Sequence, residues 1–113
     1  MDPFSGRRAL HKGLDIAAAK GAPVGSPADG TVTFQGNYGS YGKAIMVFHG
    51  YGMSTLYAHL DDVYVRVGQR LKRGELIGSV GSSGRSTGPH VHYEVIVHGV
   101  PVDPSKYILD RSL

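Results

Sequence analysis

The sequence predicts a single, mainly β domain built from antiparallel sheets. A chain of 113 residues is long enough for one modest hydrophobic core and too short for two. Its 17 glycines and 6 prolines supply many turns, and its apolar residues come in short runs rather than long helical stripes. Both features favour many short strands. We therefore expect one compact domain over residues 1–113.

The first half of the chain is predicted to consist of extended segments separated by turns, after a polar, basic lead-in over residues 1–10. Alanines at 17–19 would suit a helix, but Gly13 before them and Gly21-Ala22-Pro23 after them leave too little room for a stable one. We expect a short strand or extended segment there instead. Later elements are an extended piece at 23–27, a turn at 28–30, strands at 31–35 and 43–49 joined by a loop at 36–42, and a further segment at 53–60.

The second half is predicted to contain a pair of short strands within residues 63–78, separated by glycine turns at Gly68 and Gly74. A Gly- and Ser-rich loop over residues 81–88 then ends at a proline and leads into a strand at 91–97. Gly99 and Pro101 are expected to turn the chain into a C-terminal tail.

Composition and charge exclude several classes of protein. Without cysteine the chain has neither disulfides nor a Cys-ligated zinc finger, so any transition-metal site must use histidines and carboxylates. The net charge is +3 and the basic residues are scattered, whereas a nucleic-acid-binding protein usually concentrates them on one element. Mild basicity instead suits attraction to a polyanionic surface such as a bacterial envelope. No apolar run is as long as a membrane span, and the first residues show no signal-peptide pattern.

The strand at 91–97 carries the polar residues of greatest interest. Successive side chains of a strand alternate between faces, so His90, His92 and Glu94 share one face and the apolar residues share the other. Two imidazoles and a carboxylate beside a loop are what a metal site or an acid–base site requires. The alternative is a solvated polar face of an edge strand.

His11 and Asp15 extend this possible site. Together with His90 and His92 they offer three or four ligands to a zinc ion. Three protein ligands leave a position for water and imply catalysis, whereas four close the site and imply a structural role. The pattern itself leaves open which of His90 and His92 would bind the metal.

Three motifs, in order along the chain, resemble the lysostaphin/LytM-type zinc endopeptidases, peptidase family M23. They are His11-x-x-x-Asp15, Tyr57-Ala58-His59-Leu60 and Ser86-Thr87-Gly88-Pro89-His90-Val91-His92-Tyr93-Glu94. Weaker framework matches such as Ala28-Asp29-Gly30-Thr31-Val32 and Gly74-Glu75-Leu76-Ile77-Gly78 extend the resemblance from about Pro3 to Tyr107. A lone His-x-His would be weak, but three motifs in register are specific.

The resemblance implies that one Zn²⁺ is bound by His11, Asp15 and His92, and that His59 and His90 are catalytic histidines that do not bind it. It implies hydrolysis of peptide bonds in peptidoglycan stems or cross-bridges, and hence a place in the cell envelope, periplasmic or extracellular. Any secretion signal would then lie outside this chain, which would be a fragment of a larger protein, and we expect a monomer. The resemblance also implies a substrate groove walled by loops, which we expect Tyr41, Tyr57, Ser86 and Thr87 to line.

Two other functions are compatible with parts of the sequence. One is a non-catalytic LytM-like module that binds or activates a cell-wall amidase, although such modules typically lack the zinc ligands that this chain keeps. The other is a biotinyl or lipoyl carrier, suggested by the glycine turns of residues 67–78, but no modification motif around a lysine is present. The sequence leaves open which peptide bond is cut. Outside the motifs, His49 is expected to have a structural hydrogen-bonding role, and Glu94 to be a surface or framework carboxylate rather than a partner of a ligand histidine.

Overall fold

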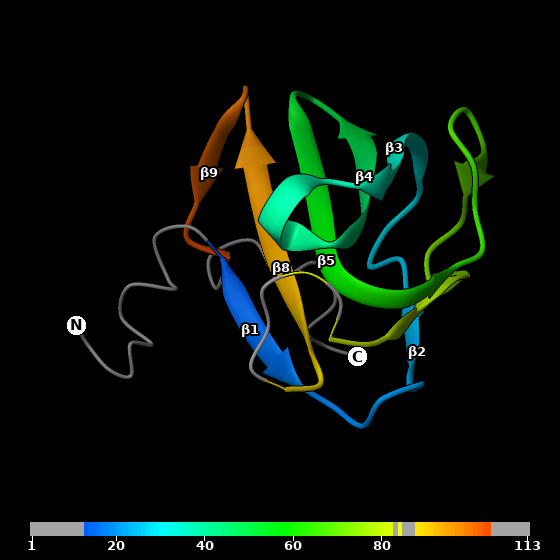
Figure 1. Ribbon diagram of the computed structural model, residues 1–113. Helices are drawn as coiled ribbons and strands as arrows, with labels where there is room; N and C mark the ends of the chain where they lie inside the picture. Colours follow the sequence, from blue (N-terminus) through cyan, green and yellow to red (C-terminus); the bar gives the residue numbers. More distant parts are fainter. Residues whose placement is uncertain (1–12, 83, 85–87, 105–113) are drawn as a thin grey trace.

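A computed structural model describes residues 13–82, 84 and 88–104 (Figure 1). Within them the chain forms strands paired in antiparallel fashion throughout, which confirms the predicted mainly β, antiparallel domain. The elements are β1 (Leu14–Ala17), β2 (Pro23–Gly25), β3 (Gly30–Asn37), the 3-10 turn η1 (Gly39–Tyr41), β4 (Lys43–Gly50), β5 (Met53–Val63), β6 (Arg70–Leu71), β7 (Leu76–Val80), β8 (His90–Val97) and β9 (Val100–Val102).

The sheet places strands that are distant in sequence beside one another. Its main path runs β1-β8-β5-β4-β3-β6; in addition β7 pairs with both β2 and β5, and β9 pairs with β8. In Figure 1, β8 lies between β1 on one side and β5 on the other, which brings the first and last parts of the described chain together. This arrangement positions the candidate site.

A β-bulge interrupts the long strand β5. Lys43 of β4 pairs with Leu60 and Ile45 pairs with Tyr57, so two residues of β5, Ala58 and His59, lie opposite one residue of β4. Such a bulge bends the strand and changes the direction of its side chains. His59 has a φ of 61°, the left-handed region that non-glycine residues rarely adopt.

The hydrophobic core consists of a main cluster and a smaller one. Strand β8 shows the expected alternation, because Val91 and Val95 are buried in the interior while His90, His92 and Glu94 lie on the other face. A smaller cluster of Ala44, Leu56 and Ala58 packs with partly buried side chains that include Tyr41 and Ile96. The main core comprises Val24, Val32, Ile45, Val47, Tyr57, Leu60, Val65, Leu71, Ile77, Val80 and Val91.

Two expectations about the strands were wrong. The chain does not pass from Gly99 directly into a tail, because His98 and Gly99, with φ of 50° and 82°, make a tight turn after which β9 pairs with β8. The two strands expected within residues 63–78 are also placed differently. Strand β5 continues to Val63 and residues 64–69 lie outside the strands, with a turn at 67–68; the strands that follow are the two-residue β6 and then β7, separated by the expected turn at Gly74.

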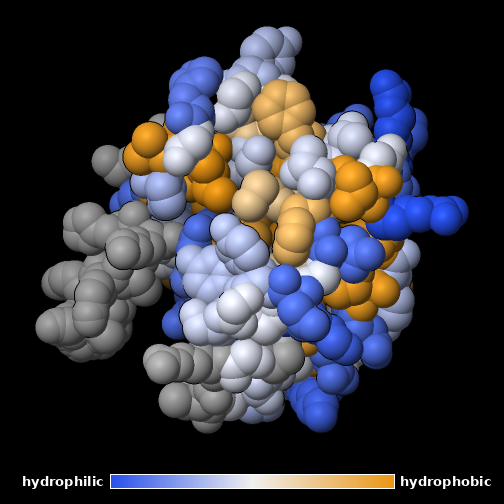
Figure 2. Space-filling view, turned by 45° about the horizontal axis from the view of Figure 1, so that its top comes forward, coloured by the Kyte–Doolittle hydropathy of each residue, from blue (hydrophilic) through white to orange (hydrophobic). Residues whose placement is uncertain are grey.

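On the face shown in Figure 2, hydrophobic patches are interrupted by hydrophilic groups. Among the described residues, no helix has the length and apolar character needed to cross a membrane.

Candidate metal and catalytic site

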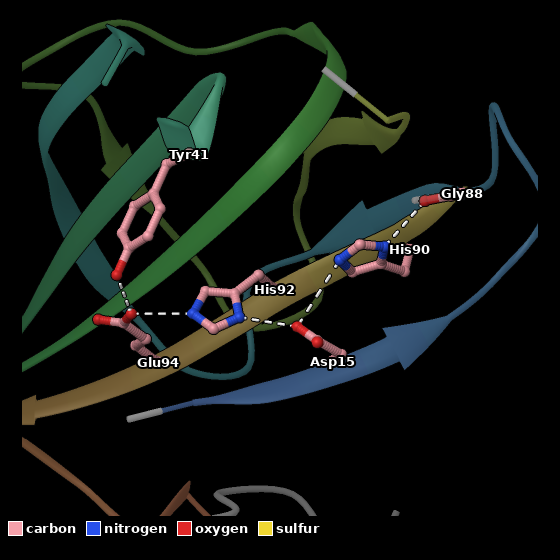
Figure 3. A network of polar contacts seen from close by, with 6 residues as sticks. All are labelled: Asp15, Tyr41, Gly88, His90, His92 and Glu94. Atoms are coloured by element: carbon pink, nitrogen blue, oxygen red, sulfur yellow. Dashed lines mark hydrogen bonds and ion pairs between the residues drawn. The ribbon is translucent and has the colours of Figure 1, made fainter. Parts of the chain in front are cut away.

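The pairing of β1 with β8 brings Asp15 to the two histidines of the His-x-His motif. Asp15 lies directly opposite His92 in the register, and Ala17 lies opposite His90. Side chains opposite one another in an antiparallel pair are within contact distance. The Asp15 Oδ1 atom accordingly lies 2.8 Å from Nδ1 of His92 and 3.7 Å from Nε2 of His90. Figure 3 shows the carboxylate between the two imidazoles.

Each histidine of this motif is oriented by a contact at its other nitrogen. The Nδ1–H of His90 donates to the backbone carbonyl of Gly88 at 2.8 Å, so Nε2 is the nitrogen that faces Asp15. In His92 the arrangement is reversed, with Nδ1 facing Asp15 and Nε2 facing Glu94 at 2.9 Å. Both side chains are mostly covered, with 17% of His90 and 16% of His92 exposed.

His59 reaches the same cluster from β5. Its ring centroid lies 5.0 Å from that of His90 and 6.2 Å from that of His92. The residue is buried and sits in the bulge with a positive φ. Backbone strain of this kind is common at functional sites, where the surrounding structure holds it in place. The structure therefore brings together four of the five residues predicted for the site, namely Asp15, His59, His90 and His92, whereas His11 lies outside the described residues.

Glu94 was expected to be a surface or framework carboxylate without a contact to a ligand histidine; it is neither exposed nor without that contact. Only 6% of its side chain is exposed, and its Oε2 accepts a hydrogen bond from Nε2–H of His92. The hydroxyl of Tyr41 donates to the same oxygen (Figure 3). The alternation of β8 had placed Glu94 on the histidine face, but nothing in the sequence indicated that Tyr41 would cover it.

These contacts change the protonation of the site in the metal-free protein. Burial alone lowers the pKa of His92, but the hydrogen bonds and negative charges of Glu94 and Asp15 outweigh it and raise the pKa above its ordinary value. Burial, together with the hydrogen bond to Glu94, raises the pKa of Tyr41 well above its usual range, so its hydroxyl stays a donor.

The chemistry of the donor set fits zinc. Imidazole nitrogen and carboxylate oxygen are ordinary ligands of Zn²⁺, and two ligands of a tetrahedral ion lie about 3.3 Å apart, given bonds of about 2.0–2.1 Å. Asp15 and His92 need to separate by only about 0.5 Å from their 2.8 Å contact to reach that spacing. Within the part of the chain that the structure describes, no three His, Asp or Glu side chains form a metal-binding group. Asp15 and His92 are thus two members of the predicted set of three.

Of the four residues predicted to line a groove, the structure describes Tyr41 and Tyr57, and these two lie in different environments. Tyr57 is 3% exposed in the main core and shares a hydrogen bond with the Thr55 hydroxyl, so its side chain does not line a groove. Tyr41 stands on the histidine face beside His92, at a centroid distance of 5.4 Å. Ser86 and Thr87 lie outside the described residues.

The predicted structural role of His49 is supported by its contacts. Its Nδ1–H donates to the carbonyl of Asp29 at 2.8 Å, and its Nε2 lies 2.7 Å from the hydroxyl of Thr55.

Fold and site together define a mainly β domain that carries a cluster of histidines and a carboxylate at the junction of β1, β8 and β5, a combination suited to metal-dependent hydrolysis. Residues 9–104 match the model of peptidase family M23. The chain belongs to this family.

Relatives and solved structures agree with this assignment. The chain is 49% identical over 104 residues to the DD-carboxypeptidase/endopeptidase Mpg of Neisseria meningitidis, covering 92% of this chain and 24% of the relative. It superimposes with a TM-score of 0.80 and 33% identity on the catalytic domain of lysostaphin from Staphylococcus simulans, covering 88% of this chain and 80% of that domain. A zinc-containing peptidase from Vibrio cholerae matches with a TM-score of 0.79 and 43% identity over 82% of this chain and 29% of that one.

Not all relatives are named as peptidases. The murein hydrolase activator NlpD of Salmonella dublin is 35% identical over 112 residues, which is 98% of this chain and 29% of the relative. The chain spans about a quarter of the length of the curated relatives it matches.

Proposed function

We propose that this chain is a zinc-dependent endopeptidase domain that hydrolyses peptide bonds in the stems or cross-bridges of peptidoglycan. The observation that carries the proposal is the meeting of Asp15 with His90 and His92 across the β1–β8 pair, with His59 delivered beside them by the bulge in β5. The names of the M23 relatives, which include peptidoglycan DD-endopeptidases, support the substrate class.

In the proposed site His11, Asp15 and His92 hold one Zn²⁺. When bound there, the ion would act as a Lewis acid and would lower the pKa of a coordinated water towards about 7. His90 would move a proton at Nε2, because its Nδ1 is committed to the Gly88 carbonyl. His59, 5.0 Å from His90 between ring centroids, is the second proton-transfer group; one of the pair accepts a proton from water and the other donates to the leaving amine.

We further propose that residues 1–113 are the peptidase domain of a longer protein that acts in the cell envelope. The relatives of this chain are about four times its length, and those named for their substrate act on peptidoglycan, which supports both statements.

The test measures bound zinc and the release of new amino groups from purified peptidoglycan for the native chain, His11→Ala and His90→Ala. We expect about one zinc and clear hydrolysis in the native chain. His11→Ala should lose both. His90→Ala should keep zinc and lose about 10²–10⁴-fold in rate, the usual contribution of a general acid or base. His98→Ala, at an exposed turn position, is the matched control and should retain both properties.

Other outcomes would redirect the proposal. A native chain that holds zinc but cuts neither polyglycine bridges nor cross-linked stems contradicts the endopeptidase function and favours the activator alternative, which a cell-wall amidase activation assay would then test. A native chain without zinc contradicts the site itself.

A further inference from the structure

We propose that Tyr41, Glu94 and Gly13 are positioning residues for His92, holding its ring so that Nδ1 faces Asp15 and is available to a cation. The inference rests on the proposed zinc site. Tyr41, Glu94 and Gly13 lie outside the proposed ligand set and should affect metal affinity through His92.

Glu94 orients the ring of His92 through a hydrogen bond. A carboxylate accepts hydrogen bonds and does not donate them, so Oε2 of Glu94 at 2.9 Å holds the ring proton on Nε2. When a cation takes the place of the proton that Nδ1 shares with Asp15 at 2.8 Å, an imidazole whose remaining proton is on Nε2 presents its lone pair at Nδ1. Hydrogen bonds of this kind to the second nitrogen of a ligand histidine fix its tautomer and ring orientation.

Tyr41 in turn holds Glu94 through a hydrogen bond. A buried carboxylate is costly unless it is hydrogen-bonded, and the side chain of Glu94 is only 6% exposed. Tyr41 donates its hydroxyl to the same Oε2 from η1, a turn 53 residues away in sequence. Its ring also packs against His92, with centroids 5.4 Å apart. Tyr41 therefore limits the movement of both members of the His92–Glu94 pair.

The backbone of Gly13 packs closely against the His92 ring and the Glu94 side chain. A Cβ atom at this position would lie 2.6 Å from Cε1 of His92, 2.7 Å from its Nε2 and 2.9 Å from Cγ of Glu94. All three distances are shorter than real Cβ contacts, so any side chain at residue 13 would displace the ring or the carboxylate. Gly13 also precedes Asp15 by two residues, so one short segment of chain seats the ring and supplies the opposing carboxylate.

The simpler explanation is that Glu94 and Tyr41 only stabilise the fold. The two roles differ in what they predict. A structural role lowers the free energy of unfolding without changing the affinity of the folded protein for zinc. A positioning role weakens zinc binding in protein that remains folded.

The experiment measures the zinc dissociation constant by competition with a chromophoric chelator, and the free energy of unfolding of the metal-free form, for each variant. The variants are Glu94→Leu, Glu94→Gln, Tyr41→Phe and Gly13→Ala. The matched controls are Glu75→Gln and Tyr38→Phe, which remove a carboxylate charge and a tyrosine hydroxyl outside the His92–Glu94 contact. Tyr38→Phe is a close match for Tyr41→Phe, because it removes a hydroxyl from the ring that packs edge-on against Tyr41.

We expect Glu94→Leu to weaken zinc binding by about 10–100-fold, the usual effect of removing a partner of a ligand histidine. Glu94→Gln keeps an oxygen that accepts from Nε2–H, so it should recover part of that loss. Tyr41→Phe and Gly13→Ala should weaken binding by about 10-fold, at the lower end of the same range. Both controls should bind zinc within twofold of the native chain.

Unchanged zinc affinity in the folded Glu94 and Tyr41 variants would overturn the inference and leave the proposed function intact. Equal losses in the variants and the controls would overturn it as well. A native chain that fails to bind zinc would instead overturn the proposed function, and this inference with it.

Discussion

Each ring nitrogen of His92 and of His49 has a polar partner, but the partners of the two histidines differ in charge. His49 lies between a backbone carbonyl and the hydroxyl of Thr55, which in turn shares a hydrogen bond of 2.6 Å with the hydroxyl of Tyr57. A single proton on Nδ1 of His49 satisfies this whole series of hydrogen bonds. His92 lies between two carboxylates, those of Asp15 and Glu94.

The charge of the partners separates a structural histidine from a metal-ligand candidate in this fold. Two carboxylates around one imidazole concentrate negative charge, which either a second ring proton or a bound cation offsets. The raised pKa of His92 in the metal-free protein reflects the first possibility. The partners of His49 are neutral groups, so they place no negative charge beside its ring. The type of partner, rather than the burial of the ring, carries the distinction.

The largest expected effect comes from replacing each of these histidines with alanine. His92→Ala should lose zinc and should reduce peptidoglycan hydrolysis by about 10³-fold or more, because several kcal/mol of Lewis-acid stabilisation disappear with the metal. His49→Ala should keep about one zinc and stay within a few-fold of native activity. Metal analysis and an amino-group release assay measure both; comparable zinc loss in the two variants would remove the distinction between the sites.

Metal binding should also separate the two histidines by their effect on stability. With free zinc at about 100 times its dissociation constant, the free energy of unfolding of the native chain should rise by about 2.7 kcal/mol. His49→Ala should show the same increment on a baseline lowered by about 1–3 kcal/mol, since Thr55 loses a buried partner. His92→Ala should show no increment. Denaturant titrations with zinc and with a chelator measure all three, and an increment that survives in His92→Ala would place the metal elsewhere.

The smallest effect concerns the neutral chain from His49 to Tyr57. Burial raises the pKa of Tyr57 far above its ordinary value of about 10, so the folded protein keeps this phenol neutral where the unfolded chain ionises it. Its stabilising contribution is therefore complete below pH 10 and declines as the pH rises further, by up to about 1.4 kcal/mol per pH unit. Burial also raises the pKa of Tyr93, to about 12, with an effect of the same sign.

Guanidinium titrations between pH 9 and pH 11 measure this slope. Tyr57→Phe should reduce it, whereas Tyr51→Phe, at a residue that is 98% exposed, should leave it unchanged. Equal slopes in Tyr57→Phe and the native chain would show that Tyr57 does not contribute to the alkaline loss of stability.

Local sequence determined much of the fold and part of the site. Glycines at 13 and 21 correctly excluded a helix between them, and the period of two in residues 90–97 correctly placed His90, His92 and Glu94 on one face. These features follow from backbone geometry within a few residues, which a sequence pattern records directly. The resemblance to family M23, carried by short motifs, was confirmed for the same reason.

Tertiary structure decided what those side chains meet. The bulge that brings His59 to His90 depends on the register between β4 and β5, and the burial of Glu94 depends on Tyr41 from a turn 53 residues away. Strand β9 likewise exists because the edge of β8 offers it a partner. Contacts between residues distant in sequence leave no local pattern, since they depend on strand register and on packing across the sheet. The sequence thus indicated the candidate site residues, and the fold determined which atoms of the described ones face one another.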